Sequence, residues 1–280
     1  MKNKVLDKQG SKLVVVKSNQ VISSSYKLTL NEQRIVLACI AKIDSMKELT
    51  KEDGITIRVD EIKDLLVVSD MNIKGFYGEL KKATEKLYNR SIILDNDGSK
   101  RRWVYEVKYN KHQGDITLFF SPSIIPYLSE LKGNFTKYKL EHIAHFKSVH
   151  SIRIYELLCQ WAFMGRKEIE ITELKMMLGL DGKYARSTNF VNRVIIVAVD
   201  EINEHSNISV AYGLRKTGRQ ITHIQFMFDV KKEPRKKTLE ENLQNQQKNI
   251  MNFVRDNPTK TKGKSEQEVR KMMRLKPEIT

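Results

Sequence analysis

The chain has 280 residues, enough for about two domains, and 40% of them are hydrophobic, so each domain can form a core. Its formal net charge of +16 predicts a polyanionic partner or an acidic membrane surface. No apolar run approaches the roughly 18 residues of a membrane-spanning helix, and residues 1–10 are polar where a signal peptide would be apolar. We therefore expect a cytoplasmic protein that makes no membrane contact. Its two cysteines, Cys39 and Cys159, lie on hydrophobic helical stretches and are interpreted as buried free thiols.

The first half of the chain predicts a mixed α and β domain, which we place at residues 12–120. Thr29 and Glu32 have the spacing of a capping box, which opens a helix. Apolar residues at helical spacing, and alternating ones flanked by turn residues, define the other elements. The expected order is an extended segment over 14–22, a helix over 31–47, a strand over 55–59, a short helix from residue 60, a helix over 72–88, and hairpin strands over 91–94, 102–109 and 115–120.

Pro122 and Pro126 mark the start of a second domain, which we place at residues 121–230. The same periodicities define its elements. The expected order is a short helical segment over 135–146, a helix over 148–164, a strand over 167–171, a helix from residue 172, a turn over 179–183, a helix over 187–205, and hairpin strands over 208–214 and 221–230.

The two halves repeat one arrangement. Residues 60–66 follow the expected strand over 55–59, and residues 172–178 follow the strand over 167–171 in the same register. In each copy a polar break, a long amphipathic helix and β-patterned segments come next. A strand, a short helix, a turn, a second helix and a hairpin form a winged helix-turn-helix. The sequence therefore predicts an α+β fold with two tandem winged-helix domains, which in a basic chain points to DNA.

Residues 231–280 differ in composition from the rest of the chain. They hold 14 Lys and Arg against 7 Asp and Glu, and therefore contribute +7 of the net charge. Aromatic residues are few, and residues 242–249 are mostly polar. This composition predicts a basic, partly disordered tail with one or two transient helices. A role in recruiting a partner and a role limited to added charge both stay open.

The helix expected over 187–205 is the better candidate for reading DNA bases. Asn189 and Asn192 suit bidentate pairing with adenine, and Arg193 suits guanine. At the entrance of the helix, the N-terminal amides would help three side chains to hold phosphates: Arg186, Ser187 and Thr188. A 100° projection predicts a buried arc on the other side, made of Phe190, Val191, Val194, Ile195, Val197, Ala198 and Ile202.

The corresponding helix of the first domain, over residues 72–88, suits phosphate contact more than base reading, through Lys74, Tyr77 and Lys81. The two expected wings add basic residues that suit the DNA backbone: Arg101 and Arg102, beside Lys100 and Trp103, in the first domain, and Arg215, Lys216 and Arg219 in the second. A charged hairpin tip is as often only a solvated surface, and both interpretations stay open.

Motifs for catalysis or metal binding are weak. His142 and His145 have helical spacing but lack the set of partners that the metal site of a DNA nickase needs. Gly263-Lys264-Ser265 is similar to the end of a P-loop, but Pro258 stands where the first glycine would be. We expect no catalytic residues, no metal and no cofactor.

Three groups of residues, taken together, resemble a known family. They are the run Leu28-Thr29-Leu30-Asn31-Glu32-Gln33-Arg34, the central runs Phe135-Thr136-x-Tyr138-x-Leu140 and Ser151-Ile152-Arg153-Ile154-Tyr155-Glu156-Leu157-Leu158, and Glu201-Ile202-Asn203 followed by Gly218-Arg219 and Ile224-x-Phe226-x-Phe228. In this order, over about residues 12–230, they resemble the plasmid theta-replication initiators of the RepE, RepA and pi kind.

The resemblance implies two winged-helix domains that bind repeated origin sequences (iterons) in double-stranded DNA as a monomer and help to open the duplex. It implies a dimer, formed mainly through the first domain, that represses its own gene, and main major-groove contacts at residues 186–193. A host initiator and the replicative helicase or its loader are further expected partners. The competing interpretation is a winged-helix transcriptional repressor without replication activity. Directly repeated binding elements would favour the initiator, and a lone inverted repeat the repressor.

Overall fold

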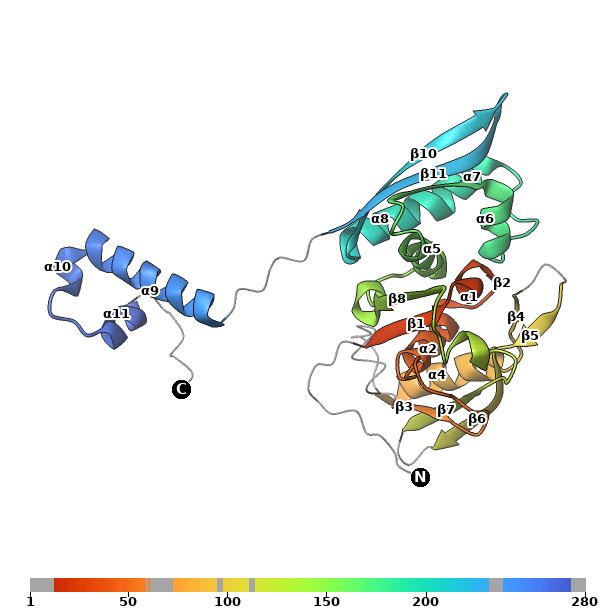
Figure 1. Ribbon diagram of the computed structural model, residues 1–280, viewed down its shortest axis with the longest axis horizontal. Helices are drawn as coiled ribbons and strands as arrows, with labels where there is room; N and C mark the ends of the chain where they lie inside the picture. Colours follow the sequence, from red (N-terminus) through yellow and green to blue (C-terminus); the bar gives the residue numbers. More distant parts are fainter. Residues whose placement is uncertain are drawn as a thin grey trace. The chain divides into compact units, whose positions relative to one another are not determined.

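The computed structural model describes residues 13–58, 60, 73–94, 98–110, 114–231 and 239–272. The chain divides into two units, residues 1–231 and residues 232–280. The first unit holds both expected winged helices, and the second holds the tail (Figure 1). The two cysteines form no disulfide, in agreement with their interpretation as free thiols; Cys39 is buried and Cys159 is half-buried. Burial raises the pKa of Cys39 to about 12.

The elements up to residue 120 carry the first winged helix. The capping box is present: the Glu32 amide donates to Thr29 Oγ1, and the Thr29 amide donates to Glu32 Oε2 at 2.9 Å. The elements are β1 (Val14–Ser18), α1 (Asn19–Ser23), β2 (Ser25–Tyr26), α2 (Leu30–Ile40), β3 (Ile55–Arg58), α4 (Ile73–Leu87), β4 (Ser91–Ile93), β5 (Lys100–Arg102), β6 (Val104–Asn110) and β7 (Asp115–Phe120).

Two of these elements differ from the expectation for a local reason. The segment over 14–22 is only in part extended, because Ser18 caps a short helix by accepting a hydrogen bond from the Gln20 amide at 3.1 Å. Helix α2 ends at Ile40 and does not reach residue 47. Asp44 forms a turn there, accepting from the Met46 amide at 3.2 Å, and such local bonds compete with a helix. The expected short helix after Asp60 lies largely outside the described residues.

The segment between the two winged helices contains η1 (Ile125–Tyr127), β8 (Phe135–Lys139), η2 (Leu140–Ile143) and α5 (Val149–Gln160). Residues 135–139 form a strand, so the expected helical segment over 135–146 was wrong in its first part. The residues alternate between exposed and buried, which is the period of a strand. Strand β8 pairs antiparallel with β1, with Lys137 opposite Val16. The N-terminal strand is therefore part of a sheet with residues beyond 120.

The second winged helix follows with β9 (Arg166–Glu170), α6 (Ile171–Met177), α7 (Ser187–Phe190), η3 (Val191–Ile195), α8 (Ile196–His205), β10 (Ile208–Thr217) and β11 (Gln220–Val230). Its sheet has the order β10-β11-β9, and the first winged helix has the matching order β6-β7-β3. In both sheets a hairpin pairs with the strand that precedes the helices. The predicted α+β class and the two tandem winged helices are thus confirmed (Figure 1).

One continuous core connects the two winged helices. Leu37 on α2, Leu158 on α5 and Ile202 on α8 are all fully buried members of it. At the junction the end of α6 approaches β2 closely. Gly179 has a φ of 63°, and a Cβ atom added to it would lie 2.6 Å from the carbonyl oxygen of Tyr26. Only glycine fits this position without strain, because both the backbone conformation and the space exclude a side chain.

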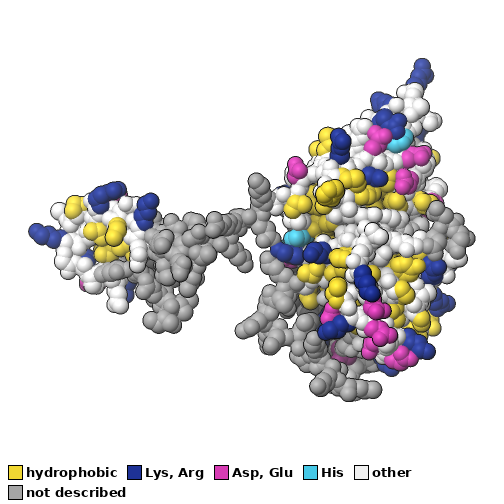
Figure 2. All heavy atoms as spheres, viewed as in Figure 1, with side chains coloured by type: hydrophobic (Ala, Val, Ile, Leu, Met, Phe, Trp, Pro, Cys, Tyr) yellow, Lys and Arg dark blue, Asp and Glu magenta, His cyan; other side chains and the backbone are white. Residues whose placement is uncertain are grey.

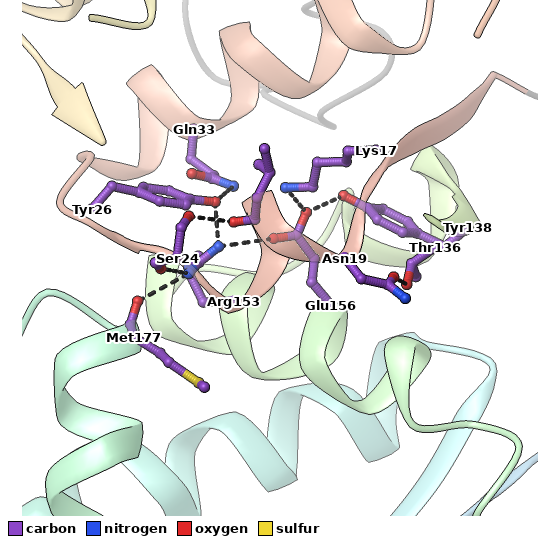
Figure 3. A network of polar contacts seen from close by, with 11 residues as sticks. Lys17, Asn19, Ser24, Tyr26, Gln33, Thr136, Tyr138, Arg153, Glu156 and Met177 are labelled. Carbon is purple, nitrogen blue, oxygen red and sulfur yellow. Dashed lines mark hydrogen bonds and ion pairs between the residues drawn. The ribbon is translucent and has the colours of Figure 1, made fainter. Parts of the chain in front are cut away.

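A buried polar network lies at the same junction (Figure 3). The Arg153 guanidinium, on α5, donates to the backbone carbonyls of Ser24 at 2.8 Å and of Met177 at 2.9 Å. It also donates to the Tyr26 hydroxyl and stacks on that ring, 3.8 Å from the centroid. A buried arginine needs such a set of acceptors, because an unpaired one would be strongly destabilising. Arg153 therefore joins β2 of the first winged helix to α6 of the second.

Glu156, one turn further along α5, extends the network toward the N-terminal strand (Figure 3). Its Oε1 forms an ion pair with Lys17 Nζ on β1 and accepts a hydrogen bond from the Tyr138 hydroxyl on β8, both at 2.6 Å, and the side chains of Lys17 and Glu156 are fully buried. Burial, with the adjacent Glu156 carboxylate, raises the pKa of Tyr138, so its hydroxyl keeps its proton as a donor. The family-like run around Arg153 and Glu156 therefore serves the packing of the domains.

The described part of the second unit forms α9 (Leu239–Asp256), α10 (Pro258–Thr261) and α11 (Glu266–Met272), drawn in blue in Figure 1. Ile250 and Val269 are buried between α9 and α11. Ser265 opens α11 with a capping box, in which its amide donates to Glu268 at 2.8 Å. The described residues of this unit thus form three helices, where the sequence predicted one or two. Among them, no helix is long and apolar enough to cross a bilayer.

Candidate nucleic-acid interface

The recognition helix of the second winged helix runs through α7, η3 and α8. Its first turns bury Phe190 and Val194 in the core. On the opposite side the residues expected to read bases are all exposed: Asn189, Asn192 and Arg193. At the entrance, Arg186 and Thr188 are exposed and Ser187 is half-buried. The six predicted residues therefore lie together at the start of the helix, five of them exposed and Ser187 half-buried.

A π-helical turn, η3, interrupts this helix at residues 191–195. Buried residues recur in pairs every four positions, at 190/191, 194/195 and 198/199. In a straight α-helix such pairs would move around the helix axis by about 40° per repeat, because its turn holds 3.6 residues. A π-helical turn is wider and keeps the pairs facing the core. Val199 is consequently buried and Val197 is 38% exposed, so the predicted burial of Val197 was wrong.

Lys175 on α6 fixes the turn that leads into the recognition helix. Its ammonium donates to the Tyr184 carbonyl at 2.8 Å and lies 5.4 Å from the centroid of the Phe190 ring. Tyr184 has a φ of 52°, a left-handed conformation that is uncommon for a side-chain-bearing residue. This role of Lys175 could not be predicted from the sequence, because a lysine on a helix surface has no spacing signal of its own.

Asn203 connects the recognition helix to the wing. Its side-chain amide donates to the Val210 carbonyl at 2.9 Å, and its Oδ1 accepts from the Val210 amide at 2.7 Å. This pair of hydrogen bonds ties the end of α8 to the first strand of the hairpin. Asn203 thus holds the helix against the wing, a role that the sequence indicated only by its place in a family-like run.

The wing is the hairpin of β10 and β11, which projects from the body of the unit with dark blue side chains at its tip (Figures 1 and 2). Gly218, with a φ of 61°, takes the first position of the two-residue turn. Lys216 and Arg219 are exposed there. Arg215 is exposed too, but it binds Glu168 on β9, with Nη2 at 2.9 Å from Oε1. Hydrogen bonds from Gln225 and Arg215 hold the pKa of the Glu168 carboxyl below its usual value.

In the first winged helix, two of the candidate residues of α4, Tyr77 and Lys81, lie toward its own sheet. Tyr77 is half-buried, and burial, with nearby Asp115, raises the pKa of its hydroxyl. The Lys81 ammonium lies 5.5 Å from the centroid of the Tyr109 ring on β6 and 3.7 Å from Glu85. The side chain of Lys74 lies outside the described side chains. Among the described side chains of α4, the exposed cations are Lys82 and Lys86, which no sequence pattern singled out.

Arg101 and Arg102 do not lie on the wing of the first winged helix. They belong to β5, which pairs with β4 in the sheet β2-β4-β5, whereas the wing is the hairpin of β6 and β7. Arg102 caps α4 instead, donating to the Tyr88 carbonyl at 3.3 Å with its guanidinium 5.2 Å from the Tyr88 ring centroid. The expected single strand over 102–109 is divided because Trp103 is fully buried between β5 and β6.

The residues considered for metal chemistry are engaged elsewhere. His142 is hydrogen-bonded to the Tyr155 hydroxyl at 2.9 Å, and the His145 ring lies 5.4 Å from the ring of His205. Across the described residues, no group of three or more His, Cys, Asp or Glu side chains is arranged to hold a metal ion.

A β-hairpin that pairs with a preceding strand and packs with helices, present twice in one basic chain, is the arrangement of a winged-helix DNA-binding protein. Residues 14–159 match the family described as Initiator Replication protein, WH1, and residues 170–228 match Initiator Rep protein, WH2. The chain therefore belongs to the plasmid replication initiator family.

Individual relatives agree with this family. A replication initiation protein of Escherichia coli is 30% identical over 231 residues, which are 79% of this chain and 71% of that protein. The PI protein of Escherichia coli is 24% identical over 268 residues, covering 82% of this chain and 87% of that protein. The crystal structure of the Pi initiator protein in complex with iteron DNA has the same fold, with a TM-score of 0.69 at 23% identity over 80% of this chain and all of that one.

Proposed function

We propose that the protein binds directly repeated origin sequences in double-stranded DNA and thereby initiates replication of a plasmid. The exposed row of Asn189, Asn192 and Arg193, next to a basic wing, is the observation that carries the proposal. These three side chains have the hydrogen-bonding groups that read adenine and guanine in the major groove. The Pi initiator protein, which has the same fold and was solved in complex with iteron DNA, supports the proposal that this chain binds DNA.

The remaining candidate residues are proposed to contact the sugar-phosphate backbone. In the second winged helix they surround the recognition helix on two sides: Arg186, Ser187 and Thr188 at its start, and Arg215, Lys216 and Arg219 on the wing. In the first winged helix they are Lys74, Tyr77, Lys81, Arg101 and Arg102. Such contacts fix the position of a protein on DNA but carry no sequence information directly.

The first winged helix is further proposed to form a homodimer that represses the gene of the protein, in equilibrium with the monomer that acts at the origin. A host initiator and the replicative helicase or its loader are the proposed protein partners. We propose that residues 12–120 form the domain for dimerisation and auxiliary DNA contacts, that residues 121–230 form the main DNA-reading domain, and that residues 231–280 are a basic tail. No catalytic step, metal or cofactor is part of the proposal, and the expected location is the cytoplasm.

Binding to duplexes with and without the directly repeated elements of the plasmid origin tests the proposal. If about 6 to 10 phosphates are neutralised, affinity falls by roughly 10³ to 10⁵ between 50 and 200 mM salt, and the repeats are preferred at every salt concentration. A nearly flat salt response contradicts DNA binding as such. Tight binding without support of plasmid replication in a host cell would point to a transcriptional repressor.

A further inference from the structure

Three cations on the wing are proposed to contact DNA. Among the described residues, Arg215 is the one of these three that binds a carboxylate. Its Nε and Nη2 atoms lie 3.0 Å and 2.9 Å from Glu168 Oε1, and Gln225 Nε2 lies 2.6 Å from Glu168 Oε2. Both oxygens of the carboxylate are therefore occupied. Because the sheet order is β10-β11-β9, the arginine reaches across the central strand to its partner.

This contact draws Arg215 away from the wing tip. Strand β11 turns Ile224 and Phe226 into the core, so Gln225 between them points to the outer face of the sheet. Gln225 is directly opposite Glu168, which places the three bonded side chains on that outer face. A β-bulge between Arg215 and Lys216 changes the register just there, so that Lys216 belongs to the tip and Arg215 does not.

We propose that Glu168 is a positioning residue that competes with DNA phosphate for Arg215 and so lowers the affinity of the wing for DNA. The inference rests on the proposed function, since it assumes that the wing contacts DNA. In the free protein the guanidinium is held on Glu168, and on binding it transfers to a phosphate. The side chains of Arg215 and Glu168 are 43% and 39% exposed, and ion pairs this accessible are weak enough to be exchanged.

The substitution Glu168→Gln tests this competition, because it removes the charge and keeps the shape and hydrogen-bonding reach of the side chain. We expect affinity for DNA to rise by about two- to fivefold at low salt. The slope of log affinity against log salt is expected to steepen by up to about 0.9, as for one added phosphate contact. Iteron and random duplexes should gain equally, because a phosphate contact does not discriminate between sequences.

Glu173→Gln is the matched control, since it removes one exposed carboxylate of the same winged helix and thus reports the effect of net charge alone. The same pair of substitutions is also made in Arg215→Ala, where the advantage of Glu168→Gln over Glu173→Gln should disappear. Equal effects of the two carboxylate substitutions in the wild-type background overturn the proposal, as does an Arg215→Ala protein that binds DNA like the wild type. If the proposed function itself failed, the wild-type chain would already lack salt-dependent preference for the repeats.

Discussion

Asn192 and Arg193 are neighbours in sequence and both lie on the solvent side of the recognition helix, while Val191 and Val194 on either side of them are buried. A side chain anchored by buried neighbours presents its polar end in a restricted set of orientations, which favours discrimination between bases. These exposures were predictable from the sequence, because they depend only on which residues are apolar. The contacts of Arg215 with Glu168 and of Lys81 with Tyr109 were not, since these partners lie on strands distant in sequence.

Replacing Arg193 by alanine should therefore change sequence preference. We expect a loss of about 1 to 3 kcal/mol at the base that Arg193 reads, with relaxed preference at that position. Lys216→Ala is the control and should weaken binding to all sequences about equally, because it is proposed to contact a phosphate. Selection of binding sites from a random duplex library, carried out with both variants, provides the measurement. An unchanged preference of Arg193→Ala would place the reading surface elsewhere.

At the scale of elements, patterns that act within a few residues were predicted well. The capping box at Thr29 and the hairpin around Gly218 form as expected, and so does the strand-helix-helix order of the second winged helix. The errors occur where tertiary contacts override local pattern. Residues 135–139 form a strand because β1 is available to pair with them, and Trp103 divides a strand because the core takes its side chain. The π-helical turn η3 likewise follows from tertiary packing, because buried residues that recur every four positions do not fit a helix of 3.6 residues per turn.

The wide turn makes a prediction that differs from that of an ideal helix, which would bury both Val194 and Val197. Val194 is 2% exposed and Val197 is 38% exposed. Val194→Asp should lower the free energy of unfolding by on the order of 3 kcal/mol or more, because it buries an unpaired charge. Val197→Asp should cost less than about 1 kcal/mol, because its carboxylate reaches water. Urea denaturation of the two variants measures the difference, and comparable losses in both would mean that the helix has α-helical register throughout.

For the whole molecule, the N-terminal strand is tied to residues beyond 120 by two kinds of contact. Strand β1 pairs with β8 along its full length, and the buried Lys17 ammonium binds Glu156 on α5. A fragment that ends at Phe120 would expose this strand and leave Lys17 without its carboxylate, which is strongly destabilising for a buried pair. The smallest stable piece that contains the first winged helix is therefore expected to extend through α5.

This defines the fragment with which to test dimerisation. Light scattering at micromolar concentration should find residues 13–160 folded and dimeric, because the proposed dimer forms through the first winged helix. A fragment of residues 13–120 serves as the comparison and should lose cooperative unfolding. If residues 13–160 are folded but strictly monomeric, while residues 161–280 form a dimer, the interface belongs to the second winged helix.

The glycine at position 179 sets how closely the two winged helices can approach. With no side chain there, backbone meets backbone, and the separation across α6 and β2 is fixed by atoms that every sequence possesses. A single added carbon would push the two winged helices apart, close to the Arg153 network that joins them. Position 179 therefore reports the spacing between the two winged helices. A state in which they move apart would accept a side chain at position 179, whereas a state in which they stay packed requires glycine there.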